Sequence, residues 1–161
     1  MLRAAGCLLL VLTGAGIGRL YSEKLEHRYR TLCALCEMSS ELIIMIEGYM
    51  TTSEMLSSLS SGDKYRELTF LSCDITKPSG RTELEAQVQA LDTSSDIKLR
   101  LICYFDELGT CDMQREKLKA ELLHSYLAEA KNALGERYRS DKRLARALGL
   151  LSGAFAAVLF I

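Results

Sequence analysis

Two cysteines three residues apart, two histidines and scattered carboxylates are the residues of this sequence that could do chemistry. Cys33 and Cys36 have the spacing of half a zinc site or of a redox-active pair. Zinc needs two further ligands, and His27 and His124 are the only histidines. Thioredoxin-like chemistry needs a βαβ setting, and no strand pattern is present. We therefore interpret both cysteines as small apolar residues of a helix and expect no metal site.

Sequence motifs of well-known enzyme classes are absent. There is no Gly-rich phosphate loop, no HExxH and no GxSxG. The carboxylates of Asp106-Glu107, Glu83 and Glu85 have basic neighbours, which is typical of a solvated helix surface. We expect no catalytic residue and no cofactor, so the protein is predicted not to be an enzyme. The alternative is a membrane-tethered enzyme or sensor domain whose site is assembled from scattered residues.

The charges are balanced overall but unevenly distributed along the chain. The 161 residues contain 20 Lys and Arg against 21 Asp and Glu, a net charge of −1. This balance excludes a strongly basic nucleic-acid binder and an acidic disordered chain. All the charged side chains except Arg3 and Arg19 lie in residues 21–146. The sequence therefore divides into an apolar segment 1–20, a polar middle 21–146 and an apolar segment 147–161.

The two apolar ends have the composition of short transmembrane helices. Ala4–Gly18 and Ala147–Ile161 contain no charged residue. Each run would span about 22 Å as a helix, against a bilayer core of about 30 Å. Arginines at their ends can extend this reach by snorkelling. A cleaved signal peptide and a buried amphipathic helix are the alternatives for the first run, but a matching run at the other end favours two membrane spans.

Positive charge predicts the orientation of these spans. Ten basic side chains flank the runs on their central sides, against Arg3 alone at the outer ends. They are Arg19, Lys24, Arg28, Arg30, Lys131, Arg137, Arg139, Lys142, Arg143 and Arg146. The polar middle is therefore predicted to be cytoplasmic, with both termini outside. The odd number of cysteines in the middle, without disulfide-framework spacing, suits a reducing compartment.

Each predicted span carries a pair of glycines four residues apart. These pairs are Gly14 with Gly18, and Gly149 with Gly153. Small residues at this spacing let helix backbones approach closely in lipid, where packing drives association. We expect the two spans to pack against each other or against spans of other proteins.

The polar middle is predicted to be a bundle of amphipathic helices. A heptad-like seam runs from Leu25 to Ile46, and Thr51 with Glu54 spells a capping box. Further helices are predicted at 65–73, 82–91 and 97–108, with 74–80 as a loop. Gly109 is expected after the end of one helix and Asp112 as the N-cap of the next. The helix from Met113 onward is expected to continue into the second span.

The spacing of two motifs resembles the stage III sporulation protein AB family. The first is Leu108-Gly109 followed by Asp112, and the second is Leu148-Gly149 followed by Gly153. The resemblance covers essentially the whole chain, including the layout of short span, helical domain and short span. The sequence departs from the family pattern at Glu116, where a Gln is typical, and in a Tyr49 turn without Pro. A Trp common in the family is also missing.

The resemblance implies a role in endospore formation. The family belongs to an operon whose products build a secretion-like channel from the mother cell to the forespore. Its member is similar to the F-type platform protein of type II secretion, which would link a cytoplasmic ATPase to membrane rings. The expected partners are the other channel proteins, including the secretion-type ATPase, and the lipid bilayer, without nucleic acid. The expected location is the mother-cell membrane around the forespore, and a homo-oligomer is left open.

Overall fold

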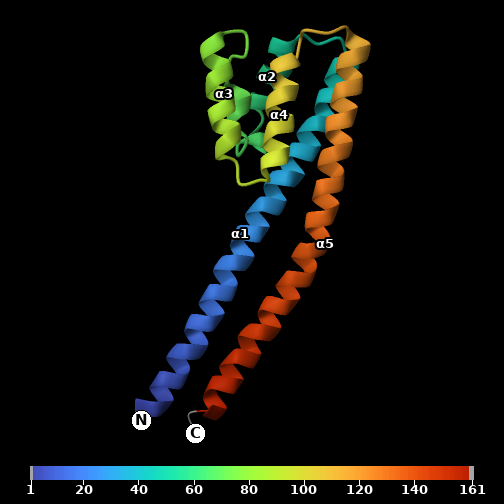
Figure 1. Ribbon diagram of the computed structural model, residues 1–161. Coiled ribbons are helices and arrows are strands. Elements are labelled where there is room, and N and C mark those ends of the chain that lie inside the picture. Colours follow the sequence, from blue (N-terminus) through green and yellow to red (C-terminus); the bar gives the residue numbers. More distant parts are fainter. Residues whose placement is uncertain (1, 160–161) are drawn as a thin grey trace. The chain divides into compact units, whose positions relative to one another are not determined.

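The computed structural model is helical throughout the part of the chain that it describes (Figure 1). It describes the backbone of residues 2–159 and the side chains of residues 20, 22–138 and 140. The helices are α1 Leu2–Glu47, α2 Thr52–Ser61, η1 Asp63–Tyr65, η2 Thr69–Ser72, α3 Pro78–Ala90, α4 Ser95–Glu107 and α5 Met113–Leu159, where η marks a 3₁₀-helix. The predicted all-α class is confirmed for this part, which contains no strand.

The chain divides into two compact units. One consists of residues 30–132, and the other of residues 1–29 with 133–161. The long helices α1 and α5 contribute residues to both units, while α2, α3 and α4 belong to the first.

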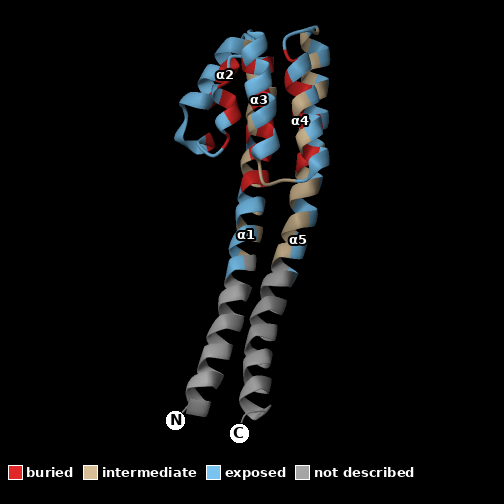
Figure 2. Ribbon diagram, turned by 60° about the vertical axis from the view of Figure 1, so that its left-hand side comes forward, coloured by how far each residue is buried: buried red, intermediate tan, exposed pale blue. Residues whose placement is uncertain are grey.

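The core of unit 30–132 lies between the short helices and the adjoining parts of α1 and α5. Buried residues lie along α2, α3 and α4, as the colouring of Figure 2 shows. Helix α3 packs against α4 and η2, and α2 packs against η1 and η2. Phe70 and Phe105 are fully buried, with ring centroids 5.4 Å apart in an edge-to-face arrangement. This geometry is the one that aromatic quadrupoles favour.

Helices α1 and α5 pair in opposite directions within this unit. Lys117, near the start of α5, donates to Glu47 at the end of α1 over 2.5 Å. Farther from this end, His124 of α5 lies against Ser39 of α1. The heptad seam predicted on α1 is confirmed here as core, because Leu32, Cys36, Ser39 and Ile46 are buried.

Two predicted element boundaries in unit 30–132 are wrong. The helix expected at 65–73 is two 3₁₀ turns, because Leu68 between them has φ −95° and ψ 68°, outside the helical region. Burial of Tyr65, Phe70 and Leu71 accompanies this irregular path. The loop expected at 74–80 ends earlier, since α3 begins at Pro78. Proline suits the first turn of a helix, where its missing N–H is not needed.

The other unit contains a stacked tyrosine pair between α1 and α5. The rings of Tyr29 and Tyr138 are 5.7 Å apart and nearly parallel, and the Tyr138 hydroxyl donates to Glu26 over 3.2 Å. Gly135 lies beside this pair inside α5. A Cβ atom there would be 3.2 Å from Cε2 of Tyr29. The absence of a side chain at Gly135 therefore makes room for the Tyr29 ring.

Among the described residues, no helix has both the length and the apolar character needed to cross a membrane. The segments predicted to span a membrane, 1–20 and 147–161, lie outside the described side chains except for Leu20. Both transmembrane helices stay predictions.

Candidate functional site

The junction between α4 and α5 places three residues that the sequence motifs had singled out. Leu108 is buried and caps the end of α4, and Gly109 follows with φ +82°. Glycine adopts this left-handed conformation without the cost that a Cβ atom brings. Asp112 then accepts a hydrogen bond from the backbone N–H of Arg115 over 3.2 Å. The predicted roles of Gly109 as a helix terminator and Asp112 as an N-cap are confirmed.

Gly109 also lies directly against the start of α2. A Cβ atom built on it would be 2.8 Å from the hydroxyl oxygen of Thr52. The turn between α1 and α2 and the turn between α4 and α5 therefore meet at one end of the unit. We call this end, residues 47–54 with 106–119, the paired-turn end.

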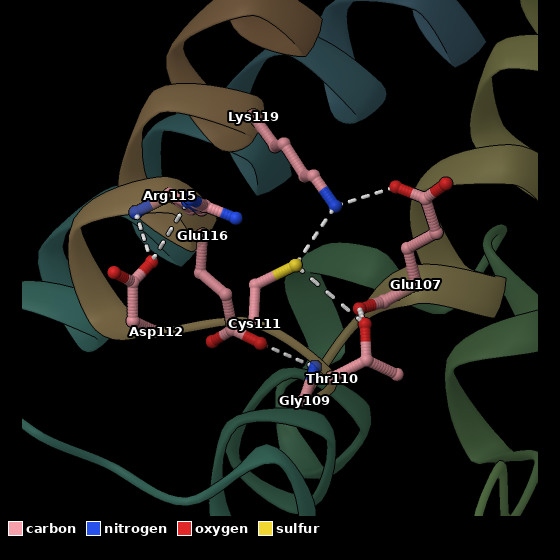
Figure 3. A network of polar contacts seen from close by, with 8 residues as sticks. All are labelled: Glu107, Gly109, Thr110, Cys111, Asp112, Arg115, Glu116 and Lys119. Atoms are coloured by element: carbon pink, nitrogen blue, oxygen red, sulfur yellow. Dashed lines mark hydrogen bonds and ion pairs between the residues drawn. The ribbon is translucent and has the colours of Figure 1, made fainter.

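Glu116 closes the α4–α5 junction from the first turn of α5. Its carboxylate accepts a hydrogen bond from the backbone N–H of Gly109 (Figure 3). The N–H of Glu116 donates to the Asp112 carbonyl over 3.0 Å. The sequence had marked this residue only as a departure from a family pattern. A glutamine could accept the same bond through its side-chain carbonyl.

A polar network surrounds the thiol of Cys111 in the same junction. The ammonium of Lys119 points at the thiol and donates to it over 3.1 Å, and it also donates to the Glu107 carboxylate over 2.5 Å (Figure 3). The Lys119 hydrogen bond, with a smaller effect from Thr110, lowers the pKa of Cys111 below that of an ordinary thiol. Sequence reasoning missed this pair, because the two residues are eight apart and on different elements.

The thiol of Cys111 is expected to react faster at neutral pH than an ordinary thiol. A lowered pKa raises the thiolate fraction, so the pH midpoint of its alkylation lies below that of a free thiol. Lys119→Met removes the ammonium and moves the midpoint upward. Iodoacetamide labelling of the full chain at a series of pH values, followed by peptide mass spectrometry, measures the alkylation rate of Cys111. The pH midpoint is then compared between wild type and Lys119→Met. Lys98→Met is the control, because Lys98 contacts the Gln89 carbonyl instead. Equal midpoints in wild type and Lys119→Met would contradict the prediction.

The turn after α1 has an unusual residue in its left-handed position. The N–H of Tyr49 donates to the Ile46 carbonyl over 3.1 Å, and that of Met50 donates to the Met45 carbonyl over 3.2 Å. These two bonds define a Schellman motif, whose left-handed residue is usually glycine. Here Tyr49 occupies it with φ 58°, and Gly48 lies one residue too early. A left-handed conformation costs an L-residue about 1–2 kcal/mol.

Helices α4 and α5 line a small cavity that is open to the surface of the same unit. Its volume is about 210 Å³, and its lining includes Cys103, Tyr104, Glu107, Lys119 and Leu122. The Tyr104 hydroxyl is buried without a hydrogen-bond partner, and burial raises its pKa. Pockets for small molecules measure about 300–1,000 Å³. This cavity has the size of a side chain rather than of a substrate.

The sequence matches the family described as stage III sporulation protein AB (spore_III_AB) over residues 3–161. The chain belongs to the stage III sporulation protein AB family. It is therefore a protein of stage III of sporulation. No curated protein and no solved structure gave a significant match.

Membership in the stage III sporulation protein AB family confirms the resemblance that the two glycine motifs indicated. The structure accounts for the first motif, because Leu108 fills the core, Gly109 allows the turn and Asp112 caps α5. It also accounts for Glu116, whose carboxylate accepts a hydrogen bond from the Gly109 N–H.

The residues of the family's second motif lie outside the described side chains. They are Leu148, Gly149 and Gly153, and the same holds for Gly14 and Gly18 of the first predicted span. The structure therefore leaves the proposed packing of these glycines as a prediction.

Cys36, one of the two cysteines with metal-site spacing, meets a histidine in this family member. Cys36 lies 3.9 Å from Nδ1 of His124, and Ser39 lies 3.0 Å from the same nitrogen. Among the described residues, no group of three or more His, Cys, Asp or Glu side chains is arranged to hold a metal ion. The arrangement is a polar contact between α1 and α5 inside the unit, and hydrogen bonds satisfy the buried Ser39 hydroxyl.

Proposed function

We propose that this protein is a membrane component of the channel between mother cell and forespore that endospore formation requires. In this proposal it is a platform that couples the operon's cytoplasmic secretion-type ATPase to the membrane rings. One observation carries it: the family match extends over residues 3–161 and so includes both apolar ends as well as the helices between them. The proposed partners are the other channel proteins and the lipid bilayer.

The distribution of apolar and basic residues supports the proposed membrane location. Two uncharged runs at the ends would cross the mother-cell membrane around the forespore, and the basic flanks would keep the middle in the cytoplasm. Gly14 with Gly18 and Gly149 with Gly153 would let the spans approach closely. Both termini would then lie outside.

Two long helices support a coupling role. Helix α1 extends unbroken over Leu2–Glu47 and α5 over Met113–Leu159, so each continues from an apolar end of the chain into residues 30–132. A continuous helix satisfies its backbone hydrogen bonds internally and resists bending. In the proposed role, α1 and α5 would be the connection along the chain between the apolar ends and residues 30–132.

Affinity purification of the tagged full chain from sporulating cells tests the proposal. We expect the secretion-type ATPase and the ring proteins of the same operon to co-purify in stoichiometric amounts. The same tagged chain expressed in a strain that lacks the ATPase gene is the control, and it should recover the ring proteins alone. Recovery of the chain without any operon product, after mild solubilisation and crosslinking, would contradict the platform function.

A further inference from the structure

Tyr49 combines a strained backbone with a side chain that does little for folding. Its φ of 58° lies in the left-handed region, where a large residue is disfavoured. Its side chain is 81% exposed, the highest value among the described large apolar residues. A glycine would form the same turn without strain. Strain that packing does not repay is a mark of functional positions.

A second exposed apolar side chain, that of Ile44, lies five residues before Tyr49 in the last turns of α1. Ile44 is 63% exposed, and its carbonyl accepts the N–H of Gly48 at the start of the same turn. Tyrosine is enriched among the few residues that dominate the binding energy of protein interfaces. We call these two exposed residues, Tyr49 and Ile44, the Tyr49 patch.

The surroundings of the Tyr49 patch are acidic. The paired-turn end contains six carboxylates against three basic residues, a net charge of −3 in a chain whose net charge is only −1. The Gly109–Thr52 contact and the Lys117–Glu47 ion pair show that its two segments lie together. A surface of this charge attracts a partner of opposite sign and disfavours acidic ones.

We propose that the Tyr49 patch, with the acidic paired-turn end around it, is the docking surface for the motor. The partner is a protein surface of net positive charge with an apolar socket that receives the Tyr49 ring. The proposal rests on the platform function, because it takes the secretion-type ATPase as the protein that carries this basic surface.

Binding of the purified ATPase to the full chain in lipid nanodiscs tests this docking surface. Tyr49→Gly should weaken binding at least tenfold while raising the Tm by a few degrees, since glycine relieves the strain. This gain in Tm shows that the variant is folded. Leu99→Ala is the matched control, because Leu99 is an exposed apolar residue of α4. It should leave the affinity unchanged.

Two further substitutions test the charge of the surface without breaking its hydrogen bonds. Glu54 caps α2 by accepting from Thr51 over 2.8 Å, and Glu116 accepts from Gly109. Glutamine retains an acceptor oxygen at both positions. The Glu54→Gln/Glu116→Gln pair should bind more weakly than wild type and with a shallower salt dependence. The control pair Glu85→Gln/Glu129→Gln makes the same change in net charge on exposed residues of α3 and α5.

The outcomes separate the docking surface from the platform function. Two outcomes would overturn the docking surface alone, provided that the wild-type chain binds the ATPase. One is an unchanged affinity of Tyr49→Gly, and the other is an equal loss of affinity in the two glutamine pairs. No binding by wild type would overturn the ATPase coupling and the docking surface with it. Selective losses in Tyr49→Gly and Glu54→Gln/Glu116→Gln support both.

Discussion

Gly80→Ala is expected to destabilise the protein by about 3 kcal/mol, because its Cβ atom has no space. Gly80 is buried in the first turn of α3, and a Cβ atom there would be 2.0 Å from the carbonyl oxygen of Asp74. The same carbonyl accepts the N–H of Lys77 over 3.2 Å, so it belongs to the turn that leads into α3. Backbone cannot rotate away as a side chain can. The helix must therefore move off the turn.

Thermal unfolding of the full chain in detergent, followed by circular dichroism, measures this loss. A destabilisation of this size should lower the Tm by about 10 °C. Gly62→Ala is the matched control, because φ there is −84° and the nearest atoms to a Cβ lie 3.8 and 4.0 Å away. It should leave the Tm unchanged or slightly higher. A Tm for Gly80→Ala within 2 °C of the control, a margin of roughly 1 kcal/mol, would contradict the prediction. It would show that the turn at Asp74 can move to accommodate the Cβ atom.

Gly109→Ala is expected to destabilise the protein by about 2 kcal/mol for two separable reasons. Its φ of +82° strains any residue with a Cβ atom. The new Cβ atom would also meet the Thr52 hydroxyl at 2.8 Å. The hydrogen bond from the Gly109 N–H to Glu116 survives the change, so the loss reports conformation and contact alone.

A double-mutant cycle with Thr52→Ala separates these two causes. Removing the Thr52 hydroxyl takes away the close contact and leaves the strained φ, so Gly109→Ala should then cost only about 1 kcal/mol. Urea unfolding of the four proteins in the same detergent measures the coupling. If Gly109→Ala lowers the free energy of unfolding equally with and without Thr52→Ala, the contact between Gly109 and the Thr52 hydroxyl does not contribute to the loss.

The elements that the sequence predicted well are those whose ends carry their own signals. Thr51 and Glu54, three residues apart at the start of α2, form the predicted capping box. The structure contains both of its hydrogen bonds, each from a backbone N–H of one residue to the side chain of the other. Gly109 and Asp112 likewise mark a helix end and a helix start through their own backbone and side-chain preferences. Such caps act over three or four residues, so local sequence is enough to predict them.

Predictions were less reliable where packing overrides local preference. Residues 65–73 have helical apolar spacing, yet they form two 3₁₀ turns with Tyr65, Phe70 and Leu71 in the core. Gly135 weakens a helix by its propensity, yet it lies within α5 beside the Tyr29 ring. In both cases a contact with a distant segment decides the structure.

Periodicity, capping and motif spacing are properties of neighbouring residues. The all-helical class, the main helix caps and the resemblance to the family could therefore be inferred from the residues alone. Which distant residues meet is visible in the fold alone. It brings His124 to Ser39, Lys119 to Cys111 and the Gly109 turn to Thr52. It also shows that Tyr49 carries a left-handed backbone and an exposed ring. These pairings depend on how helices far apart in the chain pack together, and that information is spread over the whole core rather than held in any local pattern.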